Sequence, residues 1–241
     1  FKLIKYLIFF LFLFSISYFA YYELKKNDRF YYYIEYISQK FNYQFINLEL
    51  NNLERVEKAE VIKIINKYLE KSIFLIPLKD ISNSLNDLNW VKKVNLSTNL
   101  KNKIKVEIFE YKPIGLFYYN KKLFYFSKEG KIIEKKITND DEQFIIFSGK
   151  NVLKKANDLL KILDSINEKN FLSINEAFYV NERRWDIKLN NNILINLSEK
   201  NIEDSIKNYI RLIEKLNNIE IDEIKKIDLR NNKKAIISFK E

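Results

Sequence analysis

One uncharged, strongly apolar run constrains this chain more than any other feature. Residues 6–22 read YLIFFLFLFSISYFAYY. At about 1.5 Å per helical residue, and with flanking Tyr and Lys side chains reaching toward the headgroups, this run can cross a hydrocarbon core of about 30 Å. We therefore predict a single transmembrane helix over residues 1–26. Because the sequence starts at Phe1 and contains no Met, we expect that it is either processed or lacks upstream residues, so that any cytoplasmic tail lies outside it.

A cleavable signal peptide is the alternative interpretation of this segment. No A-x-A-like cleavage site follows it, and the aromatic residues Tyr18, Phe19, Tyr21 and Tyr22 are typical of a membrane-interface belt. The sequence thus favours an uncleaved anchor. Basic residues flank the run on both sides, so the positive-inside rule leaves its orientation open.

The absence of His and Cys excludes several kinds of chemistry. A chain of 241 residues with 47% apolar side chains can bury a core and hold one or two domains besides the anchor. Without His or Cys it has no disulfide, thiolate nucleophile, Cys/His zinc site or imidazole base. The net charge of +10 is accompanied by no nucleic-acid-binding motif. We expect no cofactor and no nucleic-acid partner.

A first folded domain is predicted over residues 44–112. It follows a connector at residues 27–43 that can continue as helix, and it opens with FINLEL, which alternates as a half-buried strand does. Helical spacing recurs at residues 56–69 and again after Pro77, and strands are predicted at residues 94–97 and 103–110. The predicted order is strand, helix, helix, strand, strand.

Residues 113–241 have the pattern of a mainly antiparallel β domain with packed helices. LFYY and LFYF flank a turn at residues 120–122, and alternating apolar residues flank another at residues 190–192, so both pairs are predicted hairpins. Apolar stripes predict helices at residues 152–163 and 201–216, and the chain ends on a predicted strand pair. The fold class is therefore α+β. A terminal strand is often a sheet edge that can accept a strand from a partner.

Several segments, in their order along the chain, resemble those of one known family. FINLELNNLERVEKAEVIKIINKYL is similar to the opening of its POTRA domain, LNWVKKVNL to its Leu-Pro-Trp-Val corner and KIKVEIFEYKPIGLF to its Glu-Arg-x-Pro exit. SKEGKII and FSGKNVLKKANDLLKIL resemble later segments, RRWDIKLNNNILINL its Arg-Arg-Trp hairpin and IDLRNNKKAIISF its terminal Asp-Leu-Arg strand pair. The family is FtsQ/DivIB of bacterial cell division. Departures are Asn52 for a usual Gly, Asn89 for Pro and Tyr111 for Arg, which concern local turns.

The resemblance implies a bitopic inner-membrane protein with a cytoplasmic N-terminus and its C-terminal bulk in the periplasm, at the division septum. It implies a scaffold that catalyses no reaction, binds FtsB and FtsL, links early to late division proteins and helps control septal peptidoglycan synthesis. FtsK, FtsW and FtsI are further implied partners.

The resemblance also implies where FtsB binds, because the family's terminal strand pairs with it. The matching positions here are Arg183, Arg230, Asn231, Lys233, Ile236, Ser238 and Phe239. Alternation predicts that Ala235 and Ile237 face the core, and Phe239 is left open between core and interface. Proline at position 236 is expected to block a ladder donor of this last strand and so to abolish FtsB binding. The sequence leaves open whether Arg183 and Arg230 pair with a partner's carboxylates or with local acids such as Asp186 and Asp228.

Two other function classes are open to a membrane-anchored chain of this kind. Another membrane-anchored POTRA protein, of a secretion or outer-membrane assembly system, is expected to show repeated POTRA units or a barrel, and neither is visible. An anchored cell-wall enzyme of the acylating kind would need a Ser-x-x-Lys motif, which is missing. The acidic cluster at residues 139–142 lacks the spacing of a calcium loop, and we interpret it as a solvated loop. Trp90 and Trp185 are predicted to be packing residues.

Overall fold

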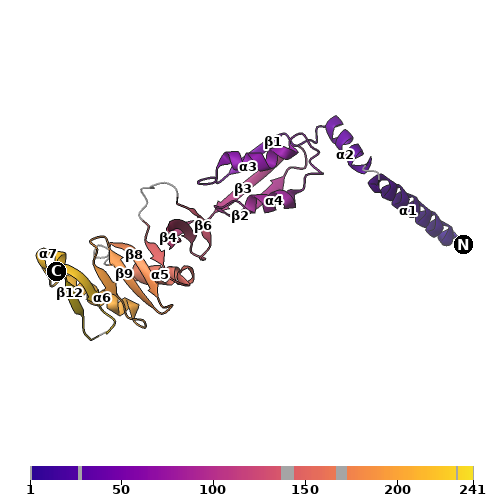
Figure 1. Ribbon diagram of the computed structural model, residues 1–241. Helices are drawn as coiled ribbons and strands as arrows, with labels where there is room; N and C mark the ends of the chain where they lie inside the picture. Colours follow the sequence, from indigo (N-terminus) through magenta and orange to yellow (C-terminus); the bar gives the residue numbers. More distant parts are fainter. Residues whose placement is uncertain (1, 27–28, 137–143, 167–172, 232, 241) are drawn as a thin grey trace. The chain divides into compact units, whose positions relative to one another are not determined.

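The computed structural model describes residues 2–26, 29–136, 144–166, 173–231 and 233–240. The chain divides into two compact units, Phe1–Glu110 and Tyr111–Glu241. A three-stranded sheet lies in the first unit and a nine-stranded sheet in the second, each with its own helices (Figure 1). The predicted α+β class is confirmed.

The first unit begins with two helices, α1 (Lys2–Lys26) and α2 (Arg29–Lys40). Within α1, the segment Ile4–Glu23 is long and apolar enough to cross a bilayer, and its side chains are exposed in the protein. Helix α2 falls in the predicted connector. It is tied to the domain that follows, because the Glu35 carboxylate accepts the Ser72 backbone N–H at 2.9 Å and the buried hydroxyls of Ser38 and Ser72 lie 2.7 Å apart.

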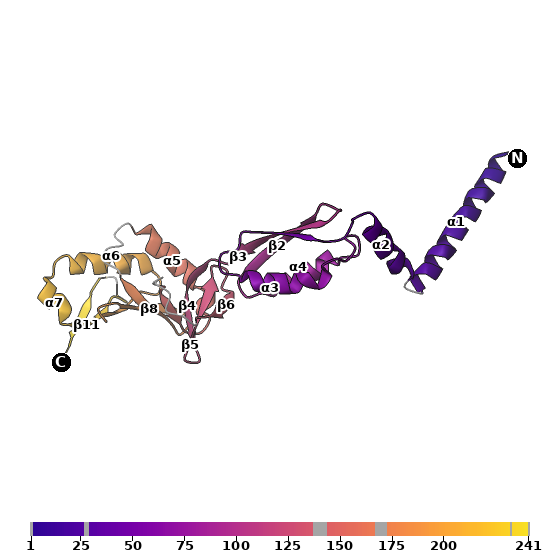
Figure 2. The same ribbon diagram turned by 90° about the horizontal axis from the view of Figure 1, so that it is seen from above.

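The remainder of this unit has the predicted order of a POTRA domain, β-α-α-β-β. Its elements are β1 (Asn47–Asn51), α3 (Lys58–Ile65), the short 3-10 helix η1 (Asn66–Tyr68), α4 (Leu78–Asn86), β2 (Val91–Thr98) and β3 (Lys103–Glu110). Strand β3 is central, parallel to β1 and antiparallel to β2. Helices α3 and α4 lie together on one side of this sheet (Figure 2).

Alternation explains why this sheet buries only one face. In β3, Ile104, Val106 and Ile108 are buried while the intervening residues are not. Helix α3 buries Val61 and Ile65 against them, and the helix predicted over residues 56–69 is instead α3 followed by η1. Asn52, the departure from a usual Gly, has φ +62°, a left-handed conformation that Asn tolerates better than most residues.

The second unit is built on one long sheet with short helices. Its elements are β4 (Pro113–Tyr119), β5 (Lys122–Ser127), β6 (Ile132–Lys135), β7 (Ile146–Ser148), η2 (Val152–Lys154), α5 (Ala156–Ser165), β8 (Ile174–Val180), β9 (Arg184–Leu189), β10 (Leu194–Asn196), α6 (Ile202–Ile213), α7 (Asn218–Asp222), β11 (Ile224–Asp228) and β12 (Ile236–Phe239). The strand order is β12-β11-β10-β9-β8-β7-β4-β5-β6.

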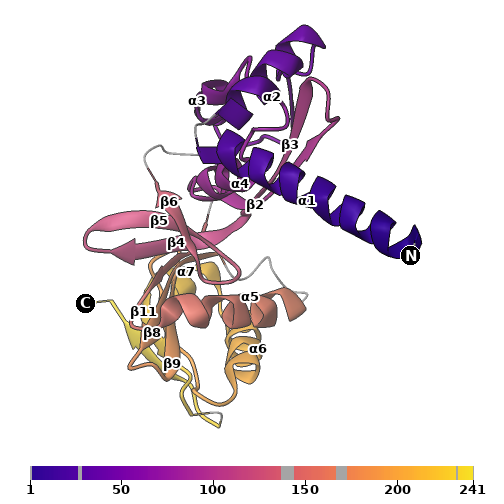
Figure 3. The ribbon, with the colours of Figure 1, turned by 90° about the vertical axis from the view of Figure 1, so that its right-hand side faces the viewer.

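The core of this unit lies between the sheet and helices α5 and α6. Both helices cover the same side of the strands (Figures 2 and 3). Alternate residues of β9, namely Trp185, Ile187 and Leu189, are buried on that side, and the Trp185 ring lies 4.8 Å from that of Tyr179. Trp185 is therefore a packing residue, as predicted, and Trp90 is likewise buried in the first unit.

The predicted hairpins, helices and terminal strand pair are present with shifted ends, and the sheet is mainly antiparallel. Three pairings are parallel, those of β7 with β4 and β8, and that of β10 with β11. Strands β6, β7 and β8 and helix α7 were not predicted. Strand β8 has a half-buried residue at nearly every position, so it shows no polar and apolar alternation that would mark it as a strand.

Candidate functional site

Strand β12 forms one end of the nine-stranded sheet. It pairs antiparallel with β11, placing Ile236 opposite Asp228, Ile237 opposite Ile227 and Ser238 opposite Lys226. No described strand covers its other side. The prediction that the terminal strand is a sheet edge is thereby met within the described residues.

Two backbone hydrogen bonds establish which groups of β12 point outward. The Leu229 N–H donates to the Asn196 carbonyl of β10 at 2.9 Å, so Asp228, one residue earlier, directs its backbone groups toward β12. At the other end, the Lys240 N–H donates to the Glu223 carbonyl at 2.8 Å. Alternation from both ends gives one answer: Ile236 and Ser238 bond inward to β11, and the N–H and C=O groups of Ile237 and Phe239 face outward.

This geometry corrects one expectation. Because the Ile236 N–H faces β11, proline at position 236 would break the pairing of β11 with β12 rather than block the open edge. The substitutions that remove an outward donor are those at Ile237 and Phe239. Of these, Phe239 is the better choice, since its side chain is 55% exposed whereas Ile237 packs on the core.

The side chains of β12 project from both faces of the sheet. Asp186, Asn196, Asp228 and Ile236 lie opposite one another in consecutive strands β9 to β12, on the face that α5 and α6 leave uncovered. Ile236 is 65% exposed at the end of this row. An isoleucine and a phenylalanine thus lie exposed on opposite faces of one edge strand.

The expected burial of this strand is partly wrong. Ile237 is half-buried and packs against the core, as predicted, but Ala235 is exposed. Ala235 precedes the first residue of β12 and belongs to the loop, so the alternation of the strand does not reach it. Phe239, left open between core and interface, lies opposite the buried Ile224 but is itself largely exposed.

Arg230 is held by a local acid. Its guanidinium Nε donates to both carboxylate oxygens of Asp228 at 2.9 Å, and the Arg230 backbone N–H donates to the same carboxylate at 3.1 Å. These hydrogen bonds, first that of the guanidinium, hold the pKa of Asp228 below its ordinary value despite partial burial. More than half of the Arg230 side chain remains exposed, so it can also contact a second acid.

Arg183 lies three strands away from β12, but it is level with the start of β12 along the strand direction. It belongs to the turn between β8 and β9, and its Nε lies 3.1 Å from the carboxylate of Glu199, which follows β10. The local acid of Arg183 is therefore Glu199, while Asp186 pairs with Arg184 at 3.3 Å. The structure gathers six predicted residues on β12 and the preceding loop, with Arg183 in the turn before β9, beyond β11 and β10.

Sequence reasoning missed a basic cleft beside this strand. It has a volume of about 270 Å3 between α6 and the loop that joins β11 to β12. Its lining is Asn208, Arg211, Leu212, Lys215, Leu229, Asn231, Lys233, Lys234 and Ala235. The available signal was Arg211 and Lys215, two cations four residues apart on the polar side of a predicted helix.

No metal site is found among the residues that the structure describes. The acidic cluster at residues 139–142 lies outside them. The fold and the site together define a class of protein: an apolar N-terminal helix, a POTRA domain and a β domain that ends on an open edge strand.

Comparisons with known proteins identify the family within that class. The family model for the C-terminal part of the cell division proteins FtsQ/DivIB matches residues 117–230, and the model of the FtsQ-type POTRA domain matches residues 46–111. Cell division protein FtsQ of Rickettsia typhi is 31% identical over 83% of this chain and 74% of its own length. The chain belongs to the FtsQ/DivIB family of cell division proteins.

A more distant relative agrees with this assignment, and one solved structure is also similar. Cell division protein DivIB of Bacillus subtilis is 27% identical over 68% of this chain and 64% of its own length. The solved major extracytoplasmic domain of DivIB from Geobacillus stearothermophilus is 15% identical, with a TM-score of 0.33 over 45% of this chain and 95% of that domain.

Proposed function

We propose that this chain is a single-pass scaffold of the division machinery, anchored in the inner membrane by α1 with its C-terminal bulk in the periplasm at the septum. Family membership and the apolar segment Ile4–Glu23 support the anchor and the process. In this proposal residues 1–26 are the anchor, 27–43 the connector, 44–112 the POTRA domain and 113–241 the partner-binding β domain. The proposed partners are FtsB and FtsL, with FtsK, FtsW, FtsI and other members of the division machinery as further partners.

The proposed binding mode is addition of an FtsB strand to β12. One observation carries it: the outward N–H and C=O groups of Ile237 and Phe239 at an edge that no described strand covers. Such groups are a template for a further strand. In strand addition the main-chain hydrogen bonds supply affinity, and alternate side chains supply specificity.

The side chains around this edge suit that mode. Ile236 offers an exposed apolar contact on one face of the sheet and Phe239 on the other, so a partner strand meets an apolar residue on either side. Arg230 and Arg183 add two half-exposed guanidinium groups at the end of the sheet where β12 begins. Ser238, Asn231 and Lys233 complete the proposed contact set.

A catalytic role receives no support from the residues present. The chain has neither His nor Cys, and no Ser-x-x-Lys motif. We accordingly propose that the chain is not an enzyme.

The test is binding of the full chain, in detergent micelles, to the periplasmic segment of FtsB from the same organism. Wild-type chain is expected to bind with micromolar or better affinity, about −8 kcal/mol. Phe239→Pro removes an outward N–H and the ring, whereas Phe239→Ala removes the ring alone. We expect Phe239→Pro to bind at least tenfold more weakly than Phe239→Ala.

Lys135→Pro is the matched control at the opposite edge of the sheet. The Lys136 N–H donates inward to the Leu123 carbonyl at 2.8 Å, so the Lys135 N–H faces outward from β6. This variant is expected to bind FtsB like the wild type. Equal binding by Phe239→Pro and Phe239→Ala refutes strand addition at β12, and loss of binding in Lys135→Pro alone moves the site to β6.

A further inference from the structure

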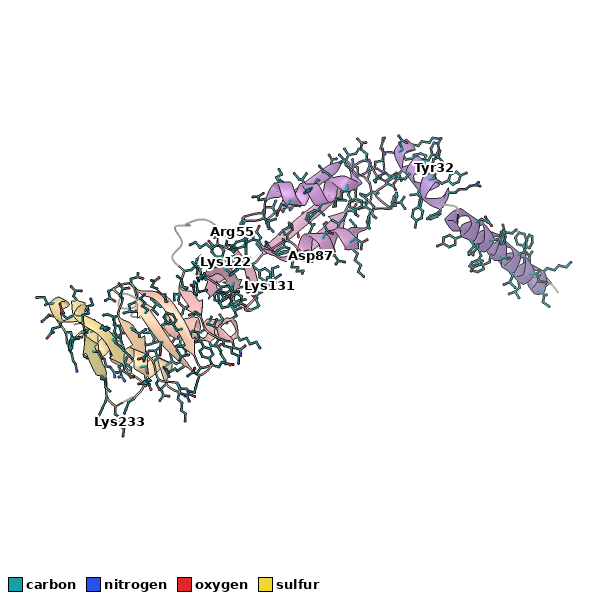
Figure 4. All side chains as sticks on the ribbon, in the orientation of Figure 1. Tyr32, Arg55, Asp87, Lys122, Lys131 and Lys233 are labelled. Atoms are coloured by element: carbon teal, nitrogen blue, oxygen red, sulfur yellow. The ribbon has the colours of Figure 1, made fainter. Side chains whose placement is uncertain are left out.

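The cleft beside β12 carries an excess of positive charge. Four cationic side chains line it, Arg211 and Lys215 from α6 and Lys233 and Lys234 from the loop after β11, together with two asparagines and no acid. Figure 4 marks Lys233 on this loop, where it extends away from the sheet. Among the residues that the structure describes, none forms an ion pair with these four side chains.

Neighbouring cations of the same elements are paired, which sets the cleft apart. Lys207, one helical turn before Arg211 on α6, lies 2.6 Å from the Glu203 carboxylate, and Arg230 is bound to Asp228. The cleft thus gathers cations that have no counter-charge among the residues that the structure describes. Like charges held close repel one another, so an anion placed between them is favoured.

The apolar residues of the cleft indicate the form of that anion. Among the lining residues Leu229 is buried, Leu212 is half-buried and Ala235 is exposed. Apolar side chains beside cations suit a carboxylate on a short aliphatic stem, because the stem can contact the apolar residues while the charged head contacts the cations. Asn208 and Asn231 can donate further hydrogen bonds to it.

The position of the cleft indicates what carries the carboxylate. Lys234 and Ala235 line it and lead directly into Ile236, the first residue of β12. A polypeptide strand paired with β12 therefore enters or leaves the sheet beside the cleft. We propose that the cleft binds a glutamate or aspartate side chain in the segment of the partner that adjoins this added strand.

This inference rests on the proposed strand addition, and the experiment separates the two. Arg211→Gln/Lys215→Gln removes two cations of α6 without touching β12. Lys121→Gln/Lys122→Gln, on the exposed turn between β4 and β5, removes the same charge elsewhere. Binding of the FtsB segment to the full chain in micelles is measured for each, at about 50 mM and about 300 mM salt.

The cleft variant is expected to bind roughly tenfold more weakly than the control variant at low salt, with a smaller difference at high salt. Replacing the acidic residues of the FtsB segment one at a time by their amides should identify one whose change weakens binding to the wild type but not to the cleft variant.

Equal binding by the cleft and control variants, with Phe239→Pro still impaired, overturns the cleft proposal and leaves strand addition standing. No binding of the segment by folded wild type overturns both. Vesicles containing an anionic phospholipid provide the alternative ligand. If the cleft variant loses only vesicle binding, the site is a lipid headgroup site and the proposal fails.

Discussion

The Glu110 carboxylate accepts the backbone N–H of Val56 at 3.0 Å, across a sequence separation of 54 residues. The same carboxylate accepts the N–H groups of Glu54 and Arg55 at 2.9 and 2.8 Å. The last residue of β3 thereby holds the loop that precedes α3. We predict that Glu110→Ala destabilises the POTRA domain by about 1–3 kcal/mol, because three backbone donors lose a charged acceptor.

The measurement is urea unfolding of the full chain in micelles, with Trp90 as reporter in a Trp185→Phe background. Glu107→Ala is the control, since Glu107 lies on the same strand and bonds only surface groups such as Lys105. It should change stability by less than about 0.5 kcal/mol. Similar effects of the two substitutions would show that Glu110 has no special role in the loop.

A second prediction concerns Gly149, which has φ +118° between β7 and η2. A Cβ atom added there would lie 2.4 Å from the carbonyl oxygen of Tyr179, a backbone atom that cannot rotate away. Gly149→Ala is therefore expected to destabilise the β domain by about 2–4 kcal/mol. Urea unfolding followed by Trp185 fluorescence measures this, and a change below about 0.5 kcal/mol would contradict the geometry.

A substitution in the turn between β4 and β5 is expected to stabilise the β domain. Asn120 and Lys121 both have positive φ, +48° and +60°, and Lys121 is exposed. A lysine in the left-handed region is strained by roughly 1 kcal/mol relative to glycine. Lys121→Gly should consequently raise the stability of the β domain by up to about 1 kcal/mol in the same unfolding assay, and a loss of stability would refute the assigned turn.

The ion pair of Asp228 and Arg230 predicts a pH dependence. The pKa of Asp228 is lowered in the folded chain, chiefly by the guanidinium hydrogen bond, so the pair stabilises the fold above the ordinary aspartate pKa of about 4. That stability is lost as pH falls through the lowered pKa. Arg230→Gln should raise the pKa of Asp228 toward its ordinary value, as followed by carboxyl-carbon NMR titration.

Arg183→Gln is the control for this titration. Arg183 pairs with Glu199 and not with Asp228, so its loss should leave the pKa of Asp228 where it is in the wild type. If both substitutions raised the pKa of Asp228 equally, its lowered pKa would come from the general positive charge around it and not from the direct pair with Arg230.

Strands whose polar and apolar residues alternate could be predicted from the sequence, and strands without that alternation could not. Strand β3 alternates buried isoleucine and valine with lysine and glutamate, and β9 alternates in the same way. Strand β8 lies between β7 and β9, with Glu176 and Phe178 on one face and Ala177 and Tyr179 on the other. The polarity of its residues does not distinguish the two faces of β8, so the sequence shows no period-two pattern that would predict a strand there.

The candidate site was predictable in its location but not in its detail. The strand pair at the end of the chain carries a period-two pattern, whereas the direction of its backbone groups depends on the register that places Ile236 opposite Asp228. The spacing of apolar side chains along one strand does not determine which of its backbone groups face the neighbouring strand. The basic cleft joins Arg211 to Lys233 through tertiary packing, which no spacing along the chain encodes.

Hydrogen exchange provides a direct test of that backbone geometry. In the wild-type chain without partner, the amides of Ile236 and Ser238 should exchange at least tenfold more slowly than those of Ile237 and Phe239, because only the first two donate to β11. Addition of the FtsB segment should then protect Ile237 and Phe239. Slow exchange of Ile237 and fast exchange of Ser238 in the unbound chain would show that the N–H groups of Ile236 and Ser238, and not those of Ile237 and Phe239, face outward. In that case Phe239→Pro would disrupt the sheet itself, and the edge-blocking substitution would have to be made at Ser238 instead.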